Sequence, residues 1–151
     1  MSAISSIYDS IVSLLDTTYA SGYTKLKNPY EIEENDNKSL NRGYGLRISP
    51  GDNSNRQISC HLSMRRDITF FNTIVNRGTE RDDTIRETAE KNLLEDHFKL
   101  IEALENDPTI NTLCAKMVYV SDNGIEQIYG EANNYLMIET TYEIEYLENL
   151  S

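Results

Sequence analysis

The chain has 151 residues and a formal net charge of -11, with 26% charged and 38% hydrophobic residues. This length fits a single domain over residues 1–151, which can bury roughly 68–70% of its unfolded surface without disulfides or metals. The sequence has no apolar run of about 18 residues, so we expect no membrane span. Its first fifteen residues lack a basic stretch and include Asp9, which is not typical of a secretory signal. The acidic charge also argues against a general nucleic-acid binder that neutralises phosphates.

A short amphipathic helix is predicted at the start of the chain. Its apolar residues recur at helical spacing: Ile4, Ile7, Tyr8, Ile11, Leu14 and Leu15. Ser2 is the expected N-cap, and the helix should end between residues 17 and 22. A short extended piece over 23–26 and a long polar loop over 28–41 follow.

A long β-hairpin comes next. Residues 44–49 and 57–70 alternate like strands, and residues 50–55 (PGDNSN) carry dense turn chemistry. Arg66 interrupts the apolar face of the second strand. The apolar run could continue through Phe71, Ile74 and Val75.

The main helix is predicted over 82–106. One stripe holds its apolar residues together with a histidine: Ile85, Ala89, Leu93, His97, Leu100, Ile101 and Leu104. Thr84 and Glu87 match a capping box, and Asp107-Pro108 should end the helix.

The last third is predicted as three strands over 115–120, 125–129 and 135–147, with turns over 121–124 and 130–134. In the last strand, one face is expected to carry Leu136, Ile138, Thr140, Tyr142, Ile144 and Tyr146. The other face is expected to carry Glu139, Thr141, Glu143 and Glu145. The order of elements predicts an α+β fold, a mostly antiparallel sheet with a long β-hairpin packed against one long and one short helix.

Charge is distributed unevenly along the chain. Residues 38–77 hold seven Lys or Arg against two acids, whereas residues 110–151 hold Lys116 against seven acids. These segments are either two solvated faces or complementary surfaces. In the second case, a basic hairpin of one subunit meets an acidic strand of the next, and such head-to-tail contacts close into rings.

The sequence carries no recognisable catalytic or cofactor motif: it lacks a phosphate loop, a nucleophile elbow and a zinc-protease motif. His97 lies on the helical stripe and is expected to pack there, while His61 is expected at the surface or an edge. Cys60 and Cys114 are expected to be reduced, buried thiols. We therefore expect no enzyme activity, no cofactor and no metal site.

The layout of an amphipathic helix, a long hairpin, one long helix and a closing three-stranded meander resembles the tail-terminator (tail-completion) proteins of long-tailed bacteriophages. The most suggestive segment is the closing one, AKMVYVSDNGIEQIYGEANNYLMIETTYEIEYLENL. The loop over 28–41 is longer than this resemblance leads us to expect.

The resemblance implies a structural virion protein at the head–tail junction, assembled in the host cytoplasm. It implies a homohexameric ring that caps the tail tube, stops tube growth and presents a face to head-completion or neck proteins. DNA would pass through the lumen without specific binding. The candidate interface residues in this picture are Arg47, Arg56, Arg65, Arg66, Glu139, Glu143 and Glu145.

Three alternatives stay open at this stage. The chain could be another neck or tail-tube component, because tube proteins have related sheets. It could be a small non-viral binding module that works as a monomer or dimer, or an enzyme with a dispersed acidic site.

Overall fold

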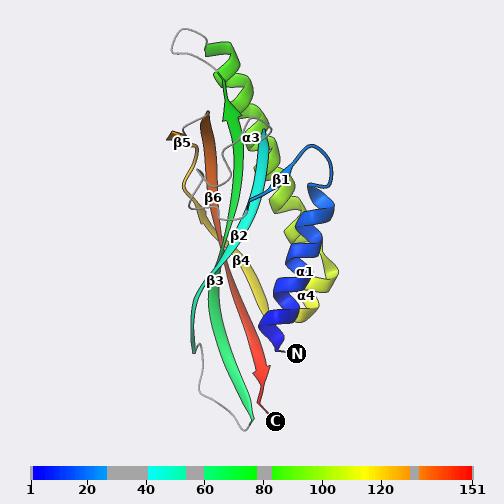
Figure 1. Ribbon diagram of the computed structural model, residues 1–151. Helices are drawn as coiled ribbons and strands as arrows, with labels where there is room; N and C mark the ends of the chain where they lie inside the picture. Colours follow the sequence, from blue (N-terminus) through cyan, green and yellow to red (C-terminus); the bar gives the residue numbers. More distant parts are fainter. Residues whose placement is uncertain (1, 27–40, 54–59, 78–82, 130–132, 151) are drawn as a thin grey trace.

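A computed structural model describes residues 2–26, 41–53, 60–77, 83–129 and 133–150. The fold is α+β, as predicted, with strands and helices in two layers (Figure 1). The helices are α1 (Ala3–Thr18), α3 (Asp83–Asn106) and α4 (Pro108–Leu113). The strands are β1 (Thr24–Lys25), β2 (Arg42–Asn53), β3 (His61–Asn76), β4 (Lys116–Asp122), β5 (Glu126–Tyr129) and β6 (Asn134–Asn149).

One sheet contains all six strands, in the order β1-β2-β3-β6-β4, with β5 also paired to β6. Every pairing is antiparallel except that of β1 with β2. The helices cover one face of this sheet, and the lower ends of β3 and β6 extend beyond them (Figure 1). The sheet therefore has one face covered by α1, α3 and α4 and a second face over which none of the described helices lies.

The main core lies between the helices and the covered face. The predicted apolar face of β6 is confirmed, because every second residue from Leu136 to Tyr146 is buried there. This core joins α1, α3 and α4 to β2, β3 and β6, and its large, fully buried members include Ile7, Ile11, Leu15, Tyr19, Ile68, Phe70, Tyr142 and Tyr146.

The hairpin of β2 and β3 is longer than predicted. The expected turn at Pro50 is wrong in its position, because β2 continues to Asn53 across a β-bulge between Ile48 and Gly51. A bulge accommodates proline at a sheet edge, where its missing N–H costs no ladder bond. The rest of the predicted turn and the start of the second strand, residues 54–59, lie outside the described residues. The polar loop predicted over 28–41 lies outside them as well, except for Asn41.

The closing segment is not a meander. Both β4 and β5 pair antiparallel with β6, so the chain does not reverse over Ser121 to Gly124 as predicted. Instead, β4 and β5 run along the same side of β6, and Asn123 N donates to Glu139 O at 3.1 Å between them. Asn123-Gly124 therefore forms the break between β4 and β5 along one edge of the sheet, and not a hairpin turn.

The helices differ from the prediction at two ends. Thr84 lies inside the first turn of α3, which begins at Asp83, so the capping box assigned to Thr84 is wrong. Asp107 and Pro108 end α3 as predicted, but they also start α4, a third helix that the sequence analysis missed. The Asp107 side chain accepts from Ile110 N at 2.8 Å, and proline fits the first turn because its absent N–H needs no partner there.

A carboxylate from the end of the chain caps the first helix. The Glu148 side chain of β6 accepts hydrogen bonds from the backbone N–H groups of Ala3 and Ile4, both at 2.9 Å. The predicted N-cap Ser2 is confirmed and accepts from Ser5 N at 3.2 Å. Negative charge at a helix N-terminus is stabilised by the unpaired N–H groups and by the helix dipole.

Replacing Glu148 by alanine should lower the free energy of unfolding by about 1–2 kcal/mol, because two N–H groups of α1 lose their charged acceptor. Glu148→Gln keeps an acceptor and should cost less, about 0.3–1 kcal/mol. Urea unfolding measures both. Glu102→Ala, at an exposed position of α3, is the control; equal effects of Glu102→Ala and Glu148→Ala would contradict the capping role.

Candidate functional site

Most of the candidate interface residues lie on the face of the sheet opposite to α1, α3 and α4. Glu139, Glu143 and Glu145 share this face of β6, as predicted. The upper part of the face is not open, because Leu26, Val75 and Tyr135 form a small buried cluster there. The lower part carries the charged residues Arg47, Asp52, Arg65, Asp67, Lys116, Glu143 and Glu145, and we call it the charged face.

The charged face alternates in sign from strand to strand. Asp52, Arg65, Glu145 and Lys116 stand side by side on β2, β3, β6 and β4. Arg65 Nη2 donates to Asp52 Oδ2 at 3.2 Å, and Lys116 Nζ lies 3.9 Å from Glu143 Oε1. The carboxylate of Asp52, with Glu143 and Glu145 nearby, raises the pKa of Arg65. Basic hairpin and acidic strand thus already meet within one subunit, and the surface that they form is mixed in charge.

The two arginines in sequence at 65 and 66 lie on opposite faces, as strand geometry requires. Arg66 lies on the helix-covered side, where its Nε donates to the hydroxyl of Tyr146 at 2.7 Å and its Nη1 donates to Ser49 O at 3.1 Å. Gly51 leaves room for this side chain, since a Cβ there would stand 2.7 Å from Arg66 Cζ. Arg66 therefore holds the bulged part of the hairpin to β6 and does not extend the charged face.

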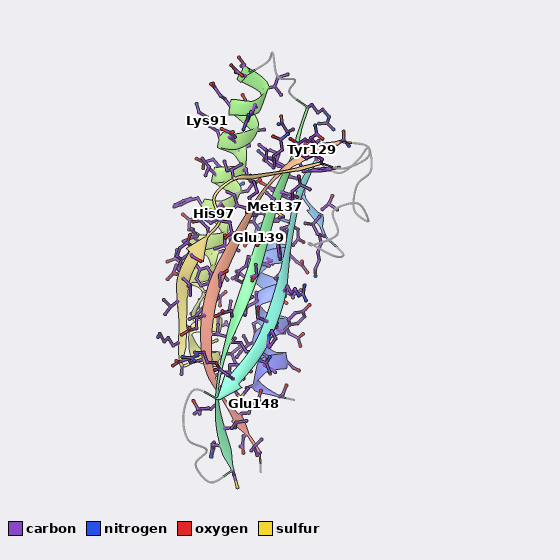
Figure 2. The ribbon with its side chains drawn as sticks, turned by 90° about the vertical axis from the view of Figure 1, so that its left-hand side faces the viewer. Lys91, His97, Tyr129, Met137, Glu139 and Glu148 are labelled. Carbon is purple, nitrogen blue, oxygen red and sulfur yellow. The ribbon has the colours of Figure 1, made fainter. Side chains whose placement is uncertain are left out.

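Of the other candidates, Arg47 is exposed on β2, and Arg56 lies outside the described residues. Glu139 stands above the charged face, half-buried in the middle of the sheet (Figure 2). It accepts from Asn123 Nδ2 at 3.1 Å, and burial, with Glu126 nearby, raises the pKa of its carboxyl. Glu139 belongs to the junction between β4 and β5, apart from the charged face.

The outer side of β2 carries a groove of about 330 Å³ between α1 and the strand edge. Tyr8, Val12 and Leu46 line it, and Tyr8 is 42% exposed. At its rim, Lys25 Nζ lies 3.6 Å from Asp16 Oδ1. The groove opens where β1 stops pairing with β2, and the sequence gives no signal for it because its walls come from three separate segments.

His97 packs against the sheet, as predicted, and its side chain is 12% exposed. Its Nδ1 shares a hydrogen bond of 3.0 Å with Thr140 Oγ1, and its Nε2 lies 3.9 Å from Asp122 Oδ2, which also accepts from the Tyr119 hydroxyl. The order of hydroxyl, imidazole and carboxylate is that of a nucleophilic triad. However, Thr140 is fully buried, so a substrate cannot reach its hydroxyl. The cluster joins α3 to β4 and β6.

This cluster makes stability depend on pH. Burial lowers the pKa of His97, and Asp122 opposes this only in part. The unfolded chain therefore binds the proton more readily, so the stabilisation is complete above the unfolded pKa of about 6.5 and is lost as pH falls. Urea unfolding should show that the free energy of unfolding falls between pH 7.5 and 5.5. His97→Gln should reduce this fall. The exposed His61 provides the control: a decline removed equally by His61→Gln would contradict this assignment.

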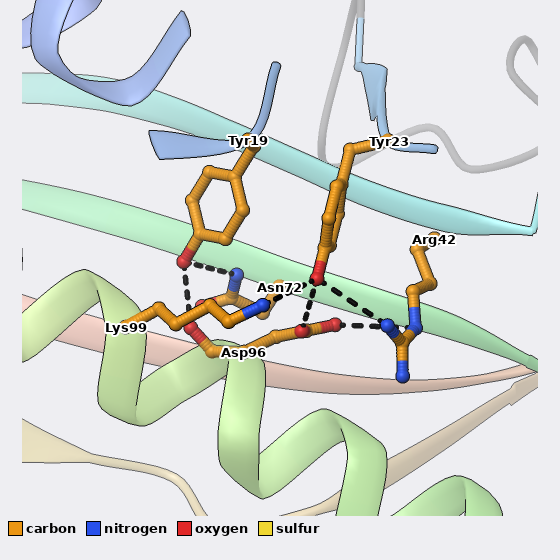
Figure 3. Close-up of polar contacts among 6 residues, drawn as sticks. All are labelled: Tyr19, Tyr23, Arg42, Asn72, Asp96 and Lys99. Atoms are coloured by element: carbon orange, nitrogen blue, oxygen red, sulfur yellow. Dashed lines mark hydrogen bonds and ion pairs between the residues drawn. The ribbon is translucent and has the colours of Figure 1, made fainter. Parts of the chain in front are cut away.

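A buried polar network, which the sequence analysis missed, lies around Asp96 (Figure 3). Asp96 is 2% exposed and accepts at Oδ1 from the Tyr23 hydroxyl at 2.6 Å, while Arg42 Nε lies 3.6 Å from its Oδ2. Its backbone oxygen accepts from the Tyr19 hydroxyl at 2.6 Å, and Asn72 Nδ2 donates to the same hydroxyl at 3.1 Å. Burial raises the pKa of Asp96, whereas Tyr23 and Arg42 lower it. A signal was present, because Asp96 lies three residues after Leu93 on the apolar stripe.

The thiols and the remaining polar groups offer little further chemistry. Cys114 is buried, as expected, whereas Cys60 is exposed, so its predicted burial is wrong. Cys60 directly precedes β3 with a φ of 62°, so it lies outside the alternation of the strand that predicted its burial. Across the described residues, no three His, Cys, Asp or Glu side chains stand close enough to share a metal ion, and no helix there is long and apolar enough to cross a membrane.

Searches for a matching protein-family model and for a matching curated protein both gave no match to this chain.

Proposed function

We propose that this chain is a structural subunit of a phage virion. In this proposal it forms a homo-oligomeric ring, a hexamer, at the end of the tail tube, where it stops tube growth and provides the attachment face for the head. Its partners are then further copies of itself, the tail tube protein and a head-completion or neck protein. DNA passes through the lumen without being gripped.

The observation that carries this proposal is the two-sided sheet. The helices α1, α3 and α4 cover one face, whereas none of the helices that the structure describes lies over the charged face, and β3 and β6 extend beyond the helix layer (Figures 1 and 2). An extended sheet with one polar face and two different edges is suited to packing beside further copies of itself. Within the described residues, the polar clusters hold elements together, and none of them combines an accessible nucleophile with a base.

The mixed charge of the charged face matters for the proposal that DNA passes through the lumen without being gripped. Arg47, Arg65 and Lys116 stand among four carboxylates there, so the face is neither a basic groove that binds phosphates nor a purely acidic wall. Such a surface favours weak, non-specific contact with DNA. This suits a passage better than a binding site.

The test is the mass and shape of the purified protein. Light scattering should give a mass of six subunits, and negative-stain electron microscopy should show closed rings. Long tubes would instead favour a tail-tube component. A protein that stays monomeric at high concentration, alone and beside tail tubes, would overturn the proposal and favour a small binding module.

A further inference from the structure

We infer that copies of this chain join edge to edge: β2 of one copy pairs antiparallel with β4 of the next, so that the sheet continues from subunit to subunit. This inference rests on the proposed ring and names the surfaces that close it. The occupant of the β2 edge is thus a second copy of this chain, presenting its opposite sheet edge.

In the described part of the chain, no strand lies against the outer edge of β2 beyond Tyr44. The described residues of β1 pair with β2 at Gly43 and Tyr44, where Leu26 N donates to Tyr44 O at 2.8 Å. Backbone groups alternate in direction along a strand, so those of Leu46 and Ile48 point to the same outer side as Tyr44. In the part of the chain that the structure describes, no strand pairs with them. Their N–H and C=O groups can therefore accept another strand.

The available edge is short and has defined ends. β1 closes it at one end, and at the other Pro50 stands in the bulge between Ile48 and Gly51. Proline and bulges are devices that limit pairing at an edge. Pairing is therefore confined to Gly45–Ser49, which fixes the register more closely than a long regular edge would.

On the opposite edge of the sheet, β4 has residues at the same level as the available stretch of β2. Arg47 stands opposite Thr69 of β3, Thr69 opposite Thr141 of β6, and Thr141 opposite Ser121 of β4. Arg47 and Ser121 therefore occupy the same level on the two outer strands. A neighbour placed beside β2 by rotation, with no shift along the strands, brings its Ser121 next to Arg47.

In the proposed contact, pairing at this level corresponds to a ring and not to a fibre. Head-to-tail contacts close into a ring when successive copies are related by rotation alone, and they give a helical filament when each copy is also displaced along the axis. In the continued sheet the strand directions are also compatible, because β2 runs parallel to β6 and β4 runs antiparallel to β6.

Charge favours the head-to-tail arrangement over pairing of like edges. The half of the sheet at the β2 edge, β2 with β3, holds four arginines against Asp52 and Asp67. The half at the other edge, β4 to β6, holds Lys116 against six acids. Arg42, Arg65 and Arg66 have partners within the subunit, so the charge on the stretch Gly45–Ser49 is that of Arg47, which would repel a second Arg47 and attract the acidic edge of the next copy.

The groove beside β2 leaves room for the incoming strand. It separates α1 from the edge, so the helix does not block approach to Leu46. Tyr8 and Val12 stand along it and would be covered by the neighbour. At the other edge, Val118 is 40% and Val120 53% exposed, and these side chains would lose solvent in the same contact.

A disulfide between copies tests this pairing. Arg47 and Ser121 are both exposed, and in one copy two strands lie between β2 and β4, a separation of about 14 Å at roughly 4.8 Å per strand. A disulfide requires Cα atoms within about 7 Å, so a bond between these positions must join two copies. The variant is Arg47→Cys with Ser121→Cys, made in a Cys60→Ser background. A second pair, Arg47→Cys with Val118→Cys, tests whether β2 and β4 of neighbouring copies pair in a shifted register.

Under oxidation, one of the two pairs should give a reducible ladder of covalent oligomers up to the size of the ring. Arg47→Cys with Glu102→Cys is the control, because Glu102 is exposed on α3 away from both edges, and this variant should stay uncrosslinked. Thermal unfolding of the reduced variants checks that each one folds like the parent.

The outcomes separate this inference from the proposed function. Rings that form without crosslinks at either pair, or with equal crosslinking in the control, overturn the edge pairing and leave the ring intact. Covalent dimers from Arg47→Cys alone indicate that like edges meet, which also overturns the head-to-tail arrangement. A protein that remains monomeric and uncrosslinked overturns both proposals.

Discussion

Replacing Phe70 by alanine should lower the free energy of unfolding by about 3–5 kcal/mol. Phe70 is 1% exposed in the middle of β3, and its ring meets that of Tyr142 edge to face with centroids 5.7 Å apart. Its truncation removes buried apolar area and leaves a cavity between the sheet and the helices, which a closely packed core fills only in part. The midpoint of urea unfolding should fall accordingly, with an unchanged slope.

Phe98 provides a matched control for this measurement. The same residue type lies 56% exposed on α3, so Phe98→Ala should change the free energy of unfolding by no more than about 0.5 kcal/mol. Phe70→Leu retains most of the volume and should cost less than alanine does. A Phe70→Ala protein as stable as Phe98→Ala would mean that the core between helices and sheet is not packed as described.

Replacing Asp96 by alanine should cost about 1–3 kcal/mol of unfolding free energy, the usual result of leaving partly buried polar groups without their charged partner. Arg42 would lose its carboxylate, and the hydroxyl of Tyr23 would lose its acceptor (Figure 3). These groups would stay beside the core with fewer partners, so the cost comes from unpaired polar groups more than from a cavity. Urea unfolding at neutral pH measures the loss.

Two variants separate the charge from the hydrogen bond. Asp96→Asn keeps an oxygen for Tyr23 but removes the attraction to Arg42, so it should fall between wild type and Asp96→Ala. Glu95→Ala removes an exposed acid from the neighbouring position and should stay within about 0.5 kcal/mol of wild type. An Asp96→Ala protein that matches Glu95→Ala would contradict the role of the network.

Local periodicity was sufficient for most of the helices and strands. The alternation in β6 predicted both of its faces correctly, because neighbouring side chains on a strand must point to opposite sides. The stripe on α3 predicted the burial of Ala89, Leu93, Leu100 and Leu104, although Ile85, in the first turn of the helix, is 44% exposed. Turn chemistry was less reliable, since Pro50-Gly51 and Asn123-Gly124 also suit bulges and interruptions at sheet edges.

The candidate site was predictable only in part. The shared face of Glu139, Glu143 and Glu145 follows from alternation, but their partners depend on which strands lie beside β6. Strand order is a long-range property, so the sequence did not show that Arg65 stands next to Glu145 in the same subunit. The position of Asp96 next to the apolar stripe of α3 was a local signal, but its partners come from other segments of the chain and were beyond any local pattern.

By itself, the sequence determined the α+β class, the two main helices, the long hairpin and the faces of the last strand, because these depend on residues close together in the chain. Only the tertiary structure decided that β4 and β5 follow one edge, that Arg66 bonds to Tyr146 and Ser49, and that Asp52, Arg65, Glu145 and Lys116 stand side by side. Those features arise from pairing between distant segments, where many registers satisfy the same local pattern and packing selects one of them.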